Sequence, residues 1–204
     1  MNTRQSRQYV APNRRREPRA PHNVNAVTEL KQPNPDVKDW TWVLSKQCPD
    51  CGFDASSITL IDLPGLIDGV IAKFADRLGE EDAARRPTPQ VWSPLEYACH
   101  VRDVCGMFAG RLGRMLDGHD PLFANWDQDA TAIEQRYWDQ DPAVVLTQLR
   151  PAAASIGAGF ASVPVEQQQR RGRRSDGAVF TVDTLGRYFV HDLVHHARDI
   201  RSTP

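Results

Sequence analysis

The sequence has no long hydrophobic run. No stretch of its 204 residues approaches the roughly 18 consecutive apolar residues that a membrane-spanning helix requires. The N-terminus is rich in arginine and lacks the apolar segment and the small-residue cleavage site of a secretory signal peptide. We therefore expect a cytoplasmic protein that has no membrane partner.

Cysteine is scarce, and the net charge is close to zero. Four cysteines in a chain of this length are too few for a disulfide framework, so we expect free thiols, metal ligands or core residues. The formal net charge is −1, and residues 1–20 hold six arginines against one acidic residue, so the remainder is mildly acidic. Because phosphate groups are bound by clustered Lys and Arg, this acidic body disfavours nucleic acid as a partner.

Nucleotide-binding loops and strand patterns are also missing. The sequence contains no G-x-G-x-x-G or Walker loop, and alternation of apolar and polar residues is sparse. Residues 1–37 are rich in Pro and Arg and are expected to form a disordered tail, because they have too little apolar surface to bury. We expect residues 38–60 to form a lead-in and residues 61–204 to form a helical domain.

Apolar spacing at the helical period predicts an all-α four-helix bundle. The second helix has the strongest start signal, since Ser93 precedes Pro94 and forms a capping box with Glu96. A short helix over 131–138 follows a loop at 122–129, and Asp176-Gly177 marks a small hairpin. Residues 40–44 are expected to be extended. The four long helices are expected over residues 62–78, 93–116, 141–160 (with a kink at Pro151) and 181–200.

The placement of histidines is the main chemical signal. His191 and His195 are four residues apart on the last helix, so both rings leave one face and can reach one cation. His100, on the second helix, is positioned to supply a third nitrogen from across the bundle core. Three neutral imidazoles and one open position are typical of a catalytic site for a divalent ion, with zinc expected first and nickel, cobalt or iron as alternatives.

Other polar residues of the two helices have less specific interpretations. Asp103, Asp192 and Asp199 can orient the ligand imidazoles, but surface exposure is the simpler expectation. His196 is one position beyond His195 and therefore about 100° further around the helix, so we expect it to point away from the ion.

The segment Cys48-Pro49-Asp50-Cys51 leaves several interpretations open. It suits a redox pair, half of a zinc site, or a reduced turn packed on the bundle. A closed zinc site needs two more ligands. Cys99 and Cys105 are six apart on one helix, about 120° out of phase, so they are poorly placed to supply both.

The segments 92–103 (WSPLEYACHVRD) and 191–199 (HDLVHHARD) resemble the two signature helices of the DinB/YfiT-like superfamily, over about residues 60–201. Members are four-helix bundles, usually homodimers, in which a histidine of the second helix and an H-x-x-x-H pair of the last bind a divalent metal. By position, the resemblance implies that His100, His191 and His195 are the metal ligands.

The better understood branches of this superfamily use a low-molecular-weight thiol such as mycothiol. The resemblance therefore implies a metal-dependent S-transferase, in which a bound thiol becomes a thiolate and attacks a small-molecule electrophile. Two alternatives stay open. One is a metal-dependent hydrolase using bound hydroxide, which needs no thiol. The other is a non-catalytic redox or interaction module, which depends on Cys48 and Cys51 and not on His100.

Overall fold

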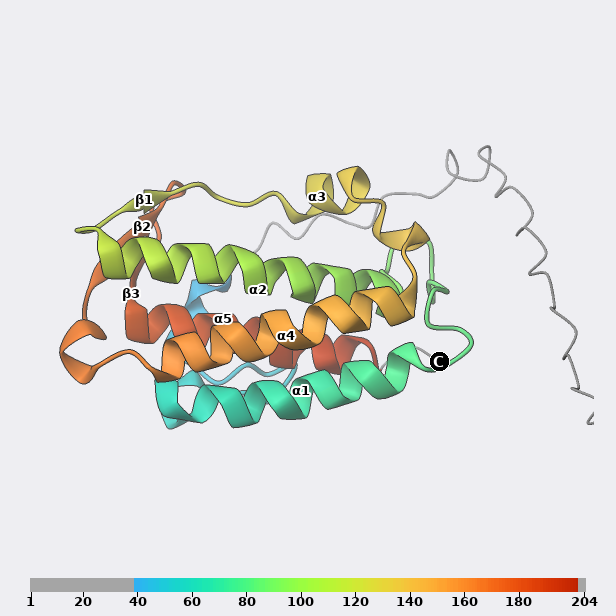
Figure 1. Cartoon of the computed structure of the whole chain (residues 1–204), viewed down its shortest axis with the longest axis horizontal. Coiled ribbons are helices and arrows are strands. Elements are labelled where there is room, and N and C mark those ends of the chain that lie inside the picture. The colour runs from blue at the N-terminus through green and yellow to red at the C-terminus, as the bar shows by residue number, and fades with distance from the viewer. Residues whose placement is uncertain (1–38, 202–204) are drawn as a thin grey trace, which may run out of the picture. The chain divides into compact units, whose positions relative to one another are not determined.

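A computed structural model of the chain describes residues 39–201, so the predicted tail at 1–37 lies outside the described residues. Within them, four long helices form a bundle, as predicted (Figure 1). α4 packs between α1 and α2, and α5 packs against the same two helices. None of the helices in residues 39–201 has the length and hydropathy needed to cross a bilayer. The bundle helices are α1 (Leu63–Leu78), α2 (Pro94–Asp117), α4 (Pro142–Ala161) and α5 (Val182–Asp199).

The helices begin where capping residues predict. At the start of α2, the hydroxyl of Ser93 accepts from the Glu96 amide at 3.2 Å, and the Glu96 carboxylate accepts from the Ser93 amide at 2.8 Å. At the start of α5, the hydroxyl of Thr181 accepts from the amide of Thr184 at 3.1 Å. α4 continues through Pro151 as one helix. These caps fix where α2 and α5 begin, and so determine which side chains face each other.

A three-stranded sheet lies at the end of the bundle where α2 finishes and α5 begins (Figure 1). The predicted hairpin is present: β2 (Arg171–Arg174) and β3 (Val179–Thr181) pair antiparallel around Gly177, whose φ is +98°. The expected loop at 122–129 is partly wrong, because β1 (Leu122–Phe123) pairs with β2 in parallel. α3 (Gln128–Glu134) starts earlier than predicted, because Asp127 accepts from the amide of Ala130 at 2.8 Å.

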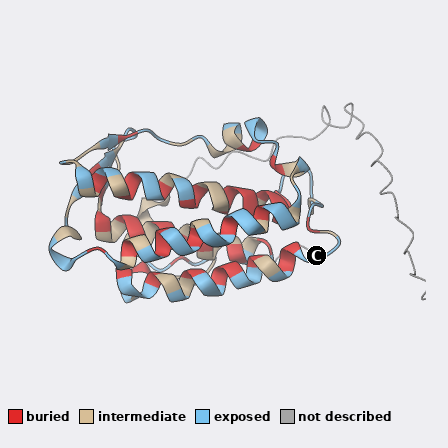
Figure 2. Ribbon diagram, viewed as in Figure 1, coloured by how far each residue is buried: buried red, intermediate tan, exposed pale blue. Residues whose placement is uncertain are grey.

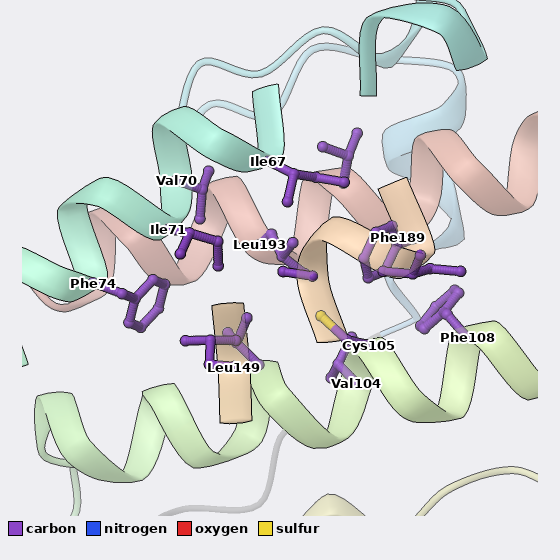
Figure 3. Close-up of a cluster of buried hydrophobic side chains, with 14 of the residues drawn as sticks. Ile67, Val70, Ile71, Phe74, Val104, Cys105, Phe108, Leu149, Phe189 and Leu193 are labelled. Atoms are coloured by element: carbon purple, nitrogen blue, oxygen red, sulfur yellow. The ribbon is translucent and has the colours of Figure 1, made fainter. Parts of the chain in front are cut away.

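The core is formed by the inward faces of the four long helices (Figure 2). Phe74 of α1, Leu149 of α4 and Phe189 of α5 are fully buried and belong to one cluster. Cys105 of α2 lies within the same cluster, so it is a core residue (Figure 3). The interior is therefore close-packed and apolar along most of the bundle.

The lead-in before α1 packs along α5. The 3₁₀ turn Trp40–Leu44 contacts α5, and Arg187 of α5 donates to the carbonyl of Ala55 at 3.2 Å. Our expectation of an extended segment here is wrong, because Asp39 accepts from the amide of Thr41 at 2.9 Å and starts a turn. This packing places the segment 48–51 beside the C-terminal half of α5.

Gly186 lets the lead-in approach α5 closely. A Cβ at this position would lie 2.5 Å from Leu60 and 3.1 Å from Phe160, both buried. We expect Gly186→Ala to lower the free energy of unfolding by about 1–2 kcal/mol, since overpacking outweighs the gain in helix propensity. Gly106→Ala is the matched control, because a Cβ there meets nothing within 4 Å, and it should stabilise by about 0.5–1 kcal/mol. Urea denaturation measures both, and equal midpoints would contradict this account.

Candidate metal centres

α5 presents two donor pairs on adjacent faces. His191 and His195 form one i,i+4 pair, and Asp192 and His196 form a second pair shifted by one residue. Because each residue advances about 100° around a helix, the two pairs face different neighbours. The lead-in lies opposite the first pair, and His100 of α2 lies opposite the second.

His100, Asp192 and His196 form a group that we call the His–Asp cluster. One donor atom from each lies within 4.8 Å of the others. His100 Nε2 is 3.5 Å from Asp192 Oδ2, and His196 Nε2 is 3.7 Å from Asp192 Oδ1. These separations are too long for good hydrogen bonds, but they suit donors arranged around one ion.

The His100 ring is buried, and its two nitrogens, Nδ1 and Nε2, make no hydrogen bond to the described residues. The side chain is 2% exposed. The ring stacks on Trp126 at a centroid distance of 5.3 Å and lies 5.4 Å from Trp92. Burial lowers the pKa of His100, so the imidazole is held in the neutral form that binds metals.

Asp192 supplies a negative charge to this cluster, and its side chain is half-buried. Its Oδ2 atom is buried and has no hydrogen-bond partner in the described part of the chain. Burial acts to raise the pKa of Asp192, but the neighbouring imidazoles of His196 and His100 outweigh it and lower the pKa to about 2. The cluster therefore contains two buried polar atoms, His100 Nε2 and Asp192 Oδ2, that make no hydrogen bond within residues 39–201.

Asp199 orients His196. The Asp199 carboxylate can only accept, so His196 Nδ1–H donates to Oδ2 at 2.9 Å, and Nε2 lies 3.7 Å from Asp192 Oδ1. We expect Asp199→Asn to weaken metal binding at this cluster by about 10–100-fold. Asp183→Asn, at the other end of α5, is the control, because Asp183 pairs with Arg187 at 3.0 Å. A competition titration with a chromogenic chelator that gave equal affinities for the two variants would contradict this role.

His191 and His195 lie with Cys48 and Cys51 in a second group, which we call the Cys–His cluster. Burial, with a contribution from neighbouring His195, lowers the pKa of His191 to about 4. Burial raises the pKa of the Cys51 thiol to about 11. All four cysteines are free thiols, and the other two, Cys99 and Cys105, are buried in the bundle.

The comparisons with known proteins agree with this fold. A family model described as the DinB superfamily matches residues 69–200. The chain belongs to the DinB superfamily. A similar solved structure is YfiT from Bacillus subtilis, described as a probable metal-dependent hydrolase with an unusual four-helix bundle topology. The two share 17% identity with a TM-score of 0.60, over 72% of this chain and 85% of that chain, which supports the fold alone. No curated protein matches the chain.

In this DinB-superfamily chain, the three histidines predicted as ligands are not brought into one cluster. His100 lies in the His–Asp cluster, whereas His191 and His195 lie in the Cys–His cluster. Our expectation that His196 points away is wrong, because it lies 4.8 Å from the His100 ring, edge to face. Asp103 accepts a hydrogen bond from Tyr137 at 2.6 Å. The signal that sequence reasoning missed is the second i,i+4 pair, Asp192 with His196.

A cavity of about 1100 Å³ opens beside the His–Asp cluster. All three residues of the cluster line it, and the segment after β1, including Trp126, forms part of its wall. Arg111 of α2 also lines the cavity and is 5% exposed. Its direct contacts are with neutral groups: the carbonyl of Ala124 at 3.0 Å, and the rings of Phe108 and Phe123. The cluster therefore faces a space large enough for a substrate, and that space contains a buried positive charge.

Proposed function

We propose that this protein is a metal-dependent enzyme whose catalytic ion is held by His100, Asp192 and His196. The observation that supports the proposal best is the set of buried donors without hydrogen-bond partners at the cavity wall. His100 Nε2 and Asp192 Oδ2 are both of this kind. A buried polar atom without a partner costs about 1–3 kcal/mol, so a ligand that satisfies several of them together is strongly favoured.

The donor set fits a divalent transition metal. Two imidazoles and one carboxylate are the ligands of catalytic zinc sites and of non-haem iron sites, both of which keep positions open for substrate. A divalent ion in this place would supply positive charge that lowers the pKa of a thiol or water molecule beside it.

The surrounding residues orient the ligands and exclude water. Asp199 fixes the tautomer of His196, as described above. Trp92 and Trp126 cover His100, which is almost completely shielded from solvent. Shielding of this kind strengthens electrostatic interactions with a charged nucleophile.

The cavity supports a reaction between two molecules. Pockets for one small molecule have volumes of about 300–1,000 Å³, and this cavity, at about 1100 Å³, is large enough for a small thiol and a small electrophile together. Arg111 gives it a buried cation suited to a carboxylate or other anionic group. We therefore propose an S-transferase, in which a low-molecular-weight thiol of the mycothiol type loses its proton to water. Its sulfur then forms a bond to an electrophilic carbon of the second substrate, while the bond from that carbon to its leaving group breaks and the leaving group departs with the electron pair.

A metal-dependent hydrolase is the second candidate. The description of the similar YfiT structure favours it. In this reaction water replaces the thiol as nucleophile, and the same three residues hold the ion.

The test is turnover by metal-loaded protein with and without thiol. We expect consumption of a model electrophile, measured by loss of free thiol, to exceed the rate in buffer and to require both metal and thiol. Hydrolysis of an ester or amide without any thiol would support the second candidate. Metal-loaded protein that does neither faster than buffer would contradict the proposed function.

A further inference from the structure

The Cys–His cluster contains four donors for which the proposed reaction has no use. Cys48 and His191 are 0% and 3% exposed, and His191 Nε2 is buried without a hydrogen-bond partner among the residues that the structure describes. One ligand atom from each of Cys48, Cys51, His191 and His195 lies within 4.8 Å of the others. We propose that these four residues form a second metal site, a closed structural zinc site that fastens the lead-in to α5.

The separations match a tetrahedral ion. With zinc–sulfur and zinc–nitrogen bonds of about 2.3 and 2.0–2.1 Å, a sulfur and a nitrogen ligand lie about 3.6 Å apart at a tetrahedral angle. Cys48 Sγ and His195 Nδ1 are 3.7 Å apart. Two sulfur and two imidazole donors in this arrangement select zinc among the common divalent ions.

The backbone holds the two cysteines in a fixed turn. The amide of Gly52 donates to the carbonyl of Cys48 at 2.8 Å, and the amide of Cys48 donates to the carbonyl of Phe53 at 2.8 Å. Gly52 has a φ of +74°, a left-handed conformation that glycine adopts without strain. Each cysteine is therefore positioned before an ion binds, and the Pro-Asp-Cys-Gly sequence serves as a ligand turn.

Aromatic rings pack against the two imidazoles of this cluster, which line the same cavity as the His–Asp cluster. The ring of Trp40 lies 4.9 Å from the ring of His195 and 5.8 Å from that of His191, and the ring of Phe53 lies 6.0 Å from that of His191. Four protein ligands fill a tetrahedral shell and leave no position for substrate, in contrast to the three of the His–Asp cluster. The Cys–His cluster is therefore assigned a structural role and not a catalytic one. Cys48 is also too deeply buried for thiol exchange with another protein.

The location explains what such an ion does. The lead-in and α5 are separated by about 140 residues in sequence, and the cluster joins them directly. An ion that binds this arrangement and not the unfolded chain adds its binding free energy to folding. It also fixes the His191–His195 face of α5, which sets the rotation of the helix that presents Asp192 and His196 to the cavity.

The first test uses the full wild-type chain loaded with two equivalents of zinc. X-ray absorption at the zinc edge should show sulfur together with nitrogen or oxygen neighbours. In cobalt-loaded protein, a thiolate-to-cobalt charge-transfer band should appear, because the His–Asp cluster contains no sulfur. Absence of both sulfur signals from the wild-type protein would overturn the proposal, and this result requires no variant to fold.

The second test assigns the sulfur donors. Cys48→Ala/Cys51→Ala should lose the charge-transfer band and one bound ion. Cys99→Ala/Cys105→Ala is the matched control, since it removes two buried thiols outside the cluster. This variant should keep the charge-transfer band and both bound ions. Retention of the band in the first variant would overturn the proposal. His100→Ala should keep the charge-transfer band and lose the ion of the His–Asp cluster. If wild-type protein shows the band but no metal-dependent turnover, the proposed function is contradicted and the structural zinc site is not.

Discussion

His196→Ala is expected to lose the ion of the His–Asp cluster and, with it, metal-dependent turnover. His196 supplies one of only three ligands there, and removing even an outer-shell partner of a ligand costs about 10–100-fold in affinity. The loss from removing the ligand itself should exceed that range. Metal analysis after dialysis, with turnover measured in parallel, checks the result.

His195→Ala is the informative comparison, because it changes the neighbouring residue of the same helix. It belongs to the Cys–His cluster, so it should keep the ion of the His–Asp cluster and retain turnover at temperatures where the variant is folded. The opposite pattern, with turnover lost in His195→Ala and retained in His196→Ala, would contradict the assignment of the two clusters.

Loss of the Cys–His cluster is expected to have the largest effect on stability. Zinc at a free concentration one thousand times its Kd stabilises a folded chain by about 4 kcal/mol. For a domain of this size, that free energy corresponds to a fall in Tm of about 8–16 °C. Cys48→Ala/Cys51→Ala should show this fall in a thermal melt in the presence of zinc, together with faster amide exchange in the turn Trp40–Leu44.

The control for this loss is chelation of the wild-type protein. Removing metal from wild type should lower its Tm toward that of Cys48→Ala/Cys51→Ala, whereas chelation should shift the variant much less. Equal melting curves and equal amide exchange for the two proteins in zinc would contradict a structural role for the cluster.

Most of the fold could be predicted from the sequence because its signals are local. The Ser93–Glu96 capping box and the Thr181 cap place the starts of α2 and α5 correctly, and Asp176-Gly177 marks the observed hairpin. The parallel pairing of β1 with β2 was missed, because it joins residues about 50 positions apart and leaves no local pattern. The turn at Trp40–Leu44 was missed because its apolar residues suggest a strand. In the structure, the Asp39 side chain accepts from the amide of Thr41 and starts a 3₁₀ turn instead.

The candidate site was only partly predictable. The sequence indicated His100, His191 and His195 as one ligand set and the segment 48–51 as half of a possible zinc site. It did not join the two cysteines to the histidines of α5, because the rotation of α5 decides which donors meet. His191 and His196 are five residues apart and face different neighbours, and spacing along α5 alone does not say which face meets α2. That depends on the rotation of α5 within the bundle, which is set by long-range contacts such as Leu60 against Gly186.

We infer that α5 divides its donors between two ions, one held by four protein ligands and one held by three. The most direct measurement is the metal content of the full chain and of two variants after identical loading and dialysis. We predict two ions in wild type, one in His196→Ala and one in Cys48→Ala/Cys51→Ala. A single ion in wild type, lost in both His100→Ala and His195→Ala but retained in Cys48→Ala/Cys51→Ala, would contradict the account.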